Sequence, residues 1–468
     1  MFENVVQGIF SAAFLASILR VTTPILLPSL GALISDRAGV INIGLEGMML
    51  ISAFVGVLFS AYAQDWFGPD VGAAIGPWLG MGMGVIAAML TALLLAFFHL
   101  KLGANLILSG IAINILGSAA TVAIMFELTG DRGNTSTLAS LQMPFIQLPE
   151  FIADIPLIGG FIFGTLDNQS IMTWIAFISV AVVSFVLYRT AAGYHLRAVG
   201  ENPSAAESVG IPVKRVQYQA LVISGLFAGL GGIHMSMGYL SLFQRDMTAG
   251  RGFIALATPL LGGGTPVGTG LASVVFGFFD ALAIRIGSLS IPPQLPQMVP
   301  YVATVMALVI YALQGRLRAR VRTLRASEGV NFDRRFWGTI QQLSVLHMLL
   351  MMPAVVGIII SVSMLFAPNG FGGVDAAYLP ALLIALASAV LFAIGLPFVL
   401  HVERISDYSI ASAIVVTISL GALIALLLSL FYEPAIAVVI GLILALAIWL
   451  LLGGWRLLGS KHQAPVPA

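Results

Sequence analysis

The sequence has no cysteine and very few charged side chains. Only 9% of its 468 residues are Asp, Glu, Lys or Arg, and 59% are hydrophobic. The lack of cysteine excludes disulfide bonds and thiolate metal sites but says little about the compartment. Soluble domains carry roughly 25% charged residues. With a mean hydropathy of +1.02, the chain has too little polar surface to form a water-soluble fold.

Several functional signatures are absent as well. The net charge of +1 gives no reason to expect a nucleic-acid partner. No stretch fits GxxxxGK[ST], and the glycine-rich stretches 262–265 and 370–373 lack the phosphate-binding Lys. Acidic residues are scattered and form no metal-type motif, so neither a membrane enzyme nor a metal site is indicated. We therefore expect no cofactor on this chain and no catalysis by it.

Long continuous apolar runs predict an all-α fold, a polytopic integral membrane helical bundle. Each helix that spans a bilayer needs about 20 apolar residues, and the chain offers about 13 such segments. The run at 252–263 is too short to cross unaided and predicts a broken or re-entrant helix. The opening residues lack a basic region and a cleavage site, so they are read as part of an uncleaved first helix. The predicted segments are 10–34, 42–62, 72–98, 103–127, 171–189, 217–242, 252–263, 267–287, 297–315, 345–366, 377–400, 409–431 and 434–452.

Basic residues near the ends of these segments predict the orientation, because cytoplasmic loops carry an excess of Lys and Arg. Arginines crowd residues 316–335, and a second basic cluster covers 189–215. With both clusters in the cytoplasm, the N-terminus and the loop 128–170 lie outside and the C-terminus lies in the cytoplasm. The predicted location is the plasma or inner membrane.

One polar stretch, GENPSAAESVGIPVKRVQ at residues 200–217, separates two apolar runs. Asn202 and Pro203 suit the cap and the first position of a helix. Gly210 suits the end of a helix, and Pro212 prevents its continuation. The pattern predicts a short helix on the membrane surface, although spacing alone leaves an ordinary solvated loop equally open.

This stretch and three others resemble the permease subunits of bacterial ABC importers for simple sugars and nucleosides, the branched-chain amino acid and ribose type. The others are GRGFIALATPLLGGGTPVGTGLASVVFGFFDAL, TPILLPSLGALISDRAGVINIGLEGMMLISAF and LPEFIADIPLIGGFIFGTL. The resemblance covers about residues 10–315, in order. It implies inward transport of a nucleoside or simple sugar by alternating access, with nucleosides slightly favoured.

The resemblance also implies partners. ATP and Mg would bind a separate ATPase subunit, and a second homologous permease and an extracellular substrate-binding lipoprotein would complete the importer. The polar stretch would then be the coupling helix that contacts the ATPase. The residues assigned to it are Gly200, Glu201, Asn202, Pro203, Ala205, Ala206, Gly210 and Ile211.

Polar residues inside apolar segments are costly and raise functional hypotheses. The candidates for the translocation path are Arg20, Asn42, Glu46, Asn105 and Asn114. The alternative is that they hold helices together through hydrogen bonds.

Sequence proximity and charge suggest partners for the charged residues inside the apolar segments. Arg37 is a candidate partner for Glu46, and Arg20 for Glu46 or Asp280. Asp280 and Arg285 are expected to form an ion pair, and His234 is expected to be an interior residue.

The resemblance ends near residue 315. We expect a permease core at 1–315, an Arg-rich cytoplasmic linker at 316–344 that could contact membrane lipid, a four-helix membrane module at 345–456 and a cytoplasmic tail at 457–468. An ion-coupled secondary transporter that acts alone, with Glu46 or Asp280 as its ion site, remains the alternative function.

Overall fold

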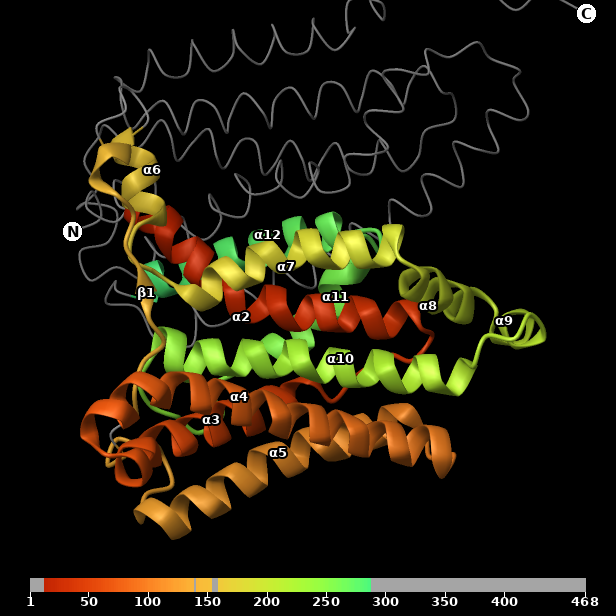
Figure 1. Cartoon of the computed structure of the whole chain (residues 1–468), viewed down its shortest axis with the longest axis horizontal. Coiled ribbons are helices and arrows are strands. Elements are labelled where there is room, and N and C mark those ends of the chain that lie inside the picture. The colour runs from red at the N-terminus through yellow and green to blue at the C-terminus, as the bar shows by residue number, and fades with distance from the viewer. Residues whose placement is uncertain (1–11, 139, 154–158, 288–468) are drawn as a thin grey trace, which may run out of the picture. The chain divides into compact units, whose positions relative to one another are not determined.

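The structure, a computed structural model, describes residues 12–138, 140–153 and 159–287 as a bundle of helices (Figure 1). In these residues seven helices are long and apolar enough to cross a membrane. They are α2 (Ala12–Arg37), α3 (Leu45–Phe67), α4 (Pro69–Ala96) with its π-helical continuation η1 (Phe97–Lys101), α5 (Leu106–Thr129), α7 (Ile171–Arg189), α10 (Val213–Ile233) with its π-helical continuation η3 (His234–Tyr239), and α12 (Pro266–Gly287).

An eighth apolar helix, α11 (Arg251–Leu261), has only 11 residues. The first eight segments predicted from the sequence therefore each correspond to a helix, and the short one at 252–263 is confirmed as short. The five predicted spans from residue 297 onward lie outside the described residues, as do the linker, the four-helix module and the tail.

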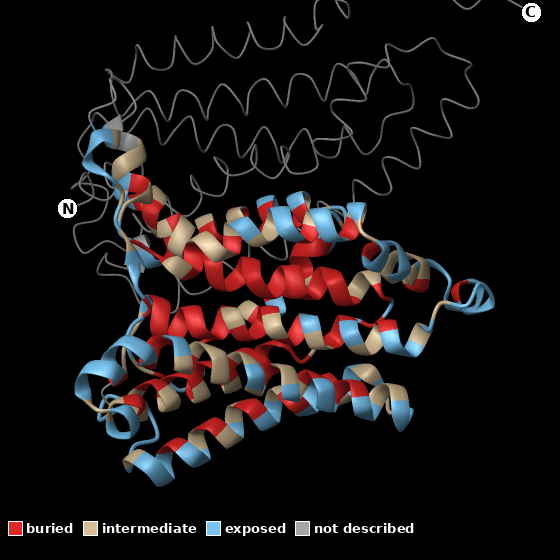
Figure 2. Cartoon of the chain, viewed as in Figure 1, coloured by how far each residue is buried: buried red, intermediate tan, exposed pale blue. Residues whose placement is uncertain are grey.

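Helices α2 and α10 form the buried centre of the bundle (Figure 2). Close backbone contacts hold other helices to this centre. The glycines at 76, 80 and 84 of α4 lie against the backbone of α3, where a Cβ on Gly80 would approach the carbonyl oxygen of Gly56 to 2.5 Å. Gly225 of α10 meets Ala88 of α4 in the same way. Small residues at these positions permit close helix crossings.

The outer helices carry large apolar side chains on their exposed faces. Leu108 and Ile115 of α5 are 68% and 65% exposed, and Phe185 of α7 is 62% exposed. Such a surface is unfavourable in water and suits contact with lipid chains.

The two ends of the bundle differ (Figure 1). At one end, called the α9 end, lie α8 (Ala191–Glu201) and α9 (Pro203–Ser208). At the opposite end, called the β1 end, the predicted loop 128–170 contains unpredicted structure. It forms a 3-10 turn η2 (Glu150–Ile152), a short helix α6 (Gly159–Leu166) and an antiparallel pair of strands, β1 (Phe145–Ile146) and β2 (Gln169–Ser170).

Candidate functional site

The stretch 200–211 at the α9 end, called the α9 segment, forms a short helix that begins and ends as its residues predict. The Asn202 Oδ1 atom accepts a hydrogen bond from the Ala205 N–H at 3.1 Å, and Pro203 is the first helical residue. After the helix, Gly210 has φ of +87°, a conformation that favours glycine. The α9 segment thus contains an ordered helix rather than an irregular loop.

The two alanines of α9 differ in burial. Ala206 is 3% exposed and packs with Val199 of α8 and Val216 of α10. Ala205 is exposed, and Val209 at the tip is 74% exposed. Ala206 thus packs inside this chain, against the apolar ends of α8 and α10, and its role in ATPase contact stays a prediction.

The α9 segment is linked to the centre of the bundle through residues 37–39, called the Arg37 turn. A Cβ on Gly200 would collide with the carbonyl oxygen of Arg37, so α8 touches the end of α2 backbone to backbone. The Arg37 Nε atom donates to the Gly264 carbonyl oxygen at 2.9 Å, and its Nη2 atom donates to the same oxygen. The Gln217 Nε2 atom of α10 donates to the Ala38 carbonyl oxygen at 3.4 Å. One turn therefore contacts α8, α10 and the α11–α12 loop.

Glu46, in the first turn of α3, is 9% exposed and binds the start of α11. Its Oε1 atom accepts hydrogen bonds from the Thr248 hydroxyl at 2.5 Å and the Gly250 N–H at 2.8 Å. Its Oε2 atom accepts one from the Gly252 N–H at 2.6 Å. All three groups are donors, which suits an ionised carboxylate. The N-termini of α3 and α11 stabilise that negative charge further.

The first residue of α11 is held from another side. The Arg251 Nη2 and Nε atoms lie 2.7 and 2.9 Å from the Asp280 Oδ2 atom of α12, in a largely buried ion pair. The expected pairings of Glu46 with Arg37, and of Arg20 with Glu46 or Asp280, are consequently wrong, whereas the side chain of Arg285 lies outside the described residues and its pairing with Asp280 stays a prediction. Among the described residues, no three His, Cys, Asp or Glu side chains lie close enough to hold a metal ion.

Two of the asparagines fasten the start of α3 to its neighbours. Asn42 is fully buried, and its Nδ2 atom donates to the Ser224 hydroxyl of α10 at 3.0 Å. The Asn114 side chain of α5 accepts from the Gly47 N–H and donates to the Ile43 carbonyl oxygen, each at 2.8 Å. Asn105 is exposed and caps α5. These contacts match the structural alternative, and a role in the path stays a prediction for all three.

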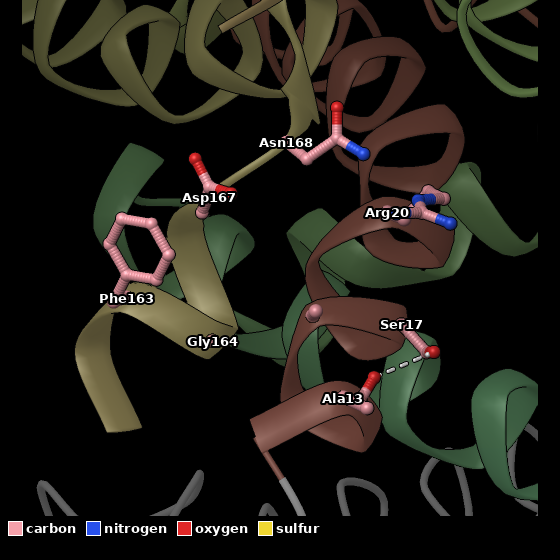
Figure 3. A pocket seen from close by; sticks show the side chains of 8 residues that line it. Ala13, Ser17, Arg20, Phe163, Gly164, Asp167 and Asn168 are labelled. Atoms are coloured by element: carbon pink, nitrogen blue, oxygen red, sulfur yellow. Dashed lines mark hydrogen bonds between the residues drawn. The ribbon is translucent and has the colours of Figure 1, made fainter. Parts of the chain in front are cut away.

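Arg20 lies in a pocket of about 410 Å³ at the β1 end (Figure 3). Of the five path candidates, Arg20 alone lines this pocket. Its Nε atom is buried without a hydrogen-bond partner among the described residues. The pocket is lined by Ala13, Ala16, Ser17, Arg20, Phe163, Gly164, Asp167 and Asn168.

Sequence reasoning missed the residues that hold α11 in place, namely Thr248, Gly250, Arg251 and Gly252. The available signal was the run TAGRGF, in which two glycines flank an arginine just before a short apolar helix. A Cβ on Gly252 would lie 2.6 Å from the Glu46 backbone nitrogen, so only glycine allows this approach.

The chain is similar to known transport proteins. Residues 14–311 match the family model described as branched-chain amino acid transport system / permease component. The guanosine ABC transporter permease protein NupQ of Bacillus subtilis is 38% identical over 293 residues, which cover 61% of this chain and 87% of that protein. A putative glucose ABC transporter permease protein of Haloferax volcanii is 32% identical over 324 residues, 65% of this chain and 92% of the relative.

The nucleoside ABC transporter permease protein NupC of Lactococcus lactis is 32% identical over 300 residues, 63% of this chain and 91% of the relative. Bacillus subtilis and Lactococcus lactis each have a second permease that also matches this chain. No solved structure shows a significant match. The family match covers more than half of the chain, includes all eight apolar helices from α2 to α12 and contains the α9 segment. The chain therefore belongs to the branched-chain amino acid transport system permease family, the permease subunits of ABC transporters.

Proposed function

We propose that this permease subunit carries a nucleoside or simple sugar into the cell, driven by an ATPase that binds its α9 segment. The named solutes of the matched relatives, guanosine, nucleosides and glucose, support this solute class. The observation that carries the coupling role is the capped helix at 203–208, which projects at one end of the bundle while its inner face packs on α8 and α10.

The contacts support a route for the movement. An ATPase that grips the outward side chains Ala205, Glu207 and Val209 displaces α9 and α8 together. Gly200 then presses on the carbonyl group of Arg37 and moves the end of α2. The Arg37 guanidinium carries the movement to Gly264 in the α11–α12 loop. Alternating access follows from the tilting of these helices relative to the rest of the bundle.

The proposed assembly contains partners beyond this chain. ATP and Mg bind the ATPase subunit, a substrate-binding lipoprotein delivers the solute, and a second permease completes the membrane part. The paired permeases in two of the matched bacteria support unlike permease subunits. In this arrangement the α9 end faces the cytoplasm and the N-terminus lies outside.

A transporter that acts alone with a coupling ion receives less support. Glu46 and Asp280, the carboxylates such a transporter would use, are engaged by Thr248, Gly250, Gly252 and Arg251 of the same chain.

The absence of cysteine allows a direct test of ATPase binding. Val209→Cys, in the full chain assembled with its ATPase in membrane vesicles, is expected to cross-link to the ATPase through a short thiol-to-amine reagent. The control is Ser136→Cys, at an exposed position in the loop after α5. Cross-linking at position 136 but not at 209 would reverse the proposed orientation, and cross-linking at neither position would remove the coupling role of α9.

A further inference from the structure

An exposed apolar stripe on α7 ends in a cation at the α9 end of the bundle. Ile178, Val182 and Phe185 are each more than half exposed. Their spacings of four and three residues place them on one face of the helix, and Arg189 continues that face one turn later. The side chain of Arg189 is exposed as well. An apolar stripe that ends in a cation suits a molecule with an acyl chain and a negatively charged headgroup.

The first turn of α8 is held against the last turn of α7 by close contacts. A Cβ on Gly193 would collide with the carbonyl oxygen of Val186. The Thr190 hydroxyl donates to the same oxygen at 2.7 Å, and its Oγ1 atom accepts from the Gly193 N–H at 3.3 Å. The Tyr194 hydroxyl donates to the Tyr188 carbonyl oxygen at 3.2 Å. Residues 188–197, called the α7–α8 corner, therefore form a defined surface beside the stripe (Figure 1).

Arg197 supplies a second cation to this corner. Its guanidinium carbon lies 5.1 Å from the centroid of the Tyr188 ring and 4.9 Å from that of Tyr194. Stacking on aromatic faces engages the plane of a guanidinium, and binding to phosphate uses the N–H groups at its edge. Tyrosine is also enriched where a helix leaves the hydrocarbon for the headgroup layer. The two tyrosines thus orient Arg197 at the level where phosphate groups lie.

The charge of the corner is not balanced by nearby carboxylates. Residues 168–200 contain Arg189, His195 and Arg197 but no Asp or Glu. In the part of the chain that the structure describes, neither arginine forms an ion pair. Arginine pairs with phosphate through two parallel hydrogen bonds, and these are stronger than bonds between neutral groups. The excess of positive charge favours an anionic headgroup over a zwitterionic one, whose own cation would be repelled.

We infer that the α7–α8 corner binds the phosphate group of an anionic phospholipid, with an acyl chain along the stripe of Ile178, Val182 and Phe185. Arg189 and Arg197 bind the headgroup, and Tyr188 and Tyr194 hold Arg197 in place. The inference uses the proposed orientation only to assign the lipid to the cytoplasmic leaflet, so binding itself does not depend on transport.

Lipid binding to the purified full chain in a neutral detergent tests the headgroup contacts, with native mass spectrometry as the readout. Arg189→Gln is expected to weaken binding of phosphatidylglycerol about fivefold, and the double variant with Arg197→Gln about thirtyfold, the usual contribution of basic residues at an anionic surface. The matched control is Arg132→Gln, because Arg132 also lies over a ring, 4.4 Å from the Phe126 centroid, but at the β1 end. An equal loss in the control, equally tight binding of phosphatidylcholine, or displacement of the lipid by inorganic phosphate would overturn the inference.

A photoreactive acyl chain tests the position of the lipid and its competition with the ATPase. Phosphatidylglycerol that carries a diazirine in its chain is expected to label residues 178–186 of α7 at least threefold more than residues 108–115 on the exposed face of α5. Phosphatidylcholine with the same group should label both helices alike. Equal labelling of the two helices by both lipids would overturn the site. Loss of the α7 labelling when the ATPase is added would also overturn it, because the corner would then be part of the ATPase contact.

Discussion

Replacing Glu46 with Gln tests whether the contact between α3 and α11 holds the bundle together. The carboxylate accepts three hydrogen bonds, from Thr248, Gly250 and Gly252. A Gln side chain has one acceptor oxygen, and its amide nitrogen is a donor. Whichever way the amide turns, at least one backbone N–H of the α11 start then faces an N–H₂ group.

The cost follows from the contacts. A hydrogen bond to a charged group contributes about 1.5–3 kcal/mol, and the N–H left without an acceptor adds its own penalty. Glu46→Gln is therefore expected to lower the free energy of unfolding by about 2–4 kcal/mol. Because 1 kcal/mol shifts the Tm of a domain of about 150–250 residues by about 2–4 °C and that of a longer chain by less, a fall in Tm of a few degrees is expected.

The assay is thermal unfolding of the purified full chain in detergent, followed by intrinsic fluorescence. The matched control is Glu127→Gln, which makes the same chemical change at an exposed position on α5. A surface change of this kind alters stability by about 0.5 kcal/mol or less. Equal Tm values for the two variants would refute the conclusion that the Glu46 carboxylate anchors α11.

Three further predictions follow from other contacts. Arg251→Met is expected to lower the free energy of unfolding by about 3–5 kcal/mol because it leaves Asp280 buried and unpaired, and adding Asp280→Leu should recover most of this loss in the same unfolding assay. Asn202→Ala removes the cap of α9, so amide hydrogen exchange in α9 should accelerate in line with a loss of about 0.5–2 kcal/mol, while exchange in α5 stays unchanged. Gly200→Val separates α8 from the end of α2, and uptake per ATP hydrolysed by the assembled transporter should fall about fivefold or more; an unchanged ratio would contradict the route through the Arg37 turn.

Local sequence signals predicted the helices well. The span expected at 171–189 has the bounds of α7, and the short run expected at 252–263 is α11 at 251–261. The Asn202 cap and the Gly210 turn were likewise predictable, because a helix cap and a left-handed glycine depend only on neighbouring residues. The short elements between α5 and α7 were not predicted, since a two-residue strand pair has no periodicity of its own.

The partners of buried polar side chains were not predictable in the same way. Glu46 was expected near Arg37, nine residues away, but it binds residues about 200 positions further along the chain. Arg37 instead reaches Gly264. The burial of Ala206 was not predictable either, because the packing of α8 and α10 decides which face of α9 is covered.

The sequence by itself determined that this protein is built of apolar helices suited to a membrane and that it resembles a permease, while spacing alone left the polar stretch 200–217 open between a short helix and a loop. Those properties depend on contiguous runs of residues and on contacts within a few positions. Only the tertiary structure decided that Glu46 anchors α11, that the Arg37 turn joins α9 to the core, and that Arg20 lines a pocket at the β1 end. Each of these depends on which distant helices pack together, and a charge or a hydrogen-bonding group takes whichever partner that packing brings within about 3 Å.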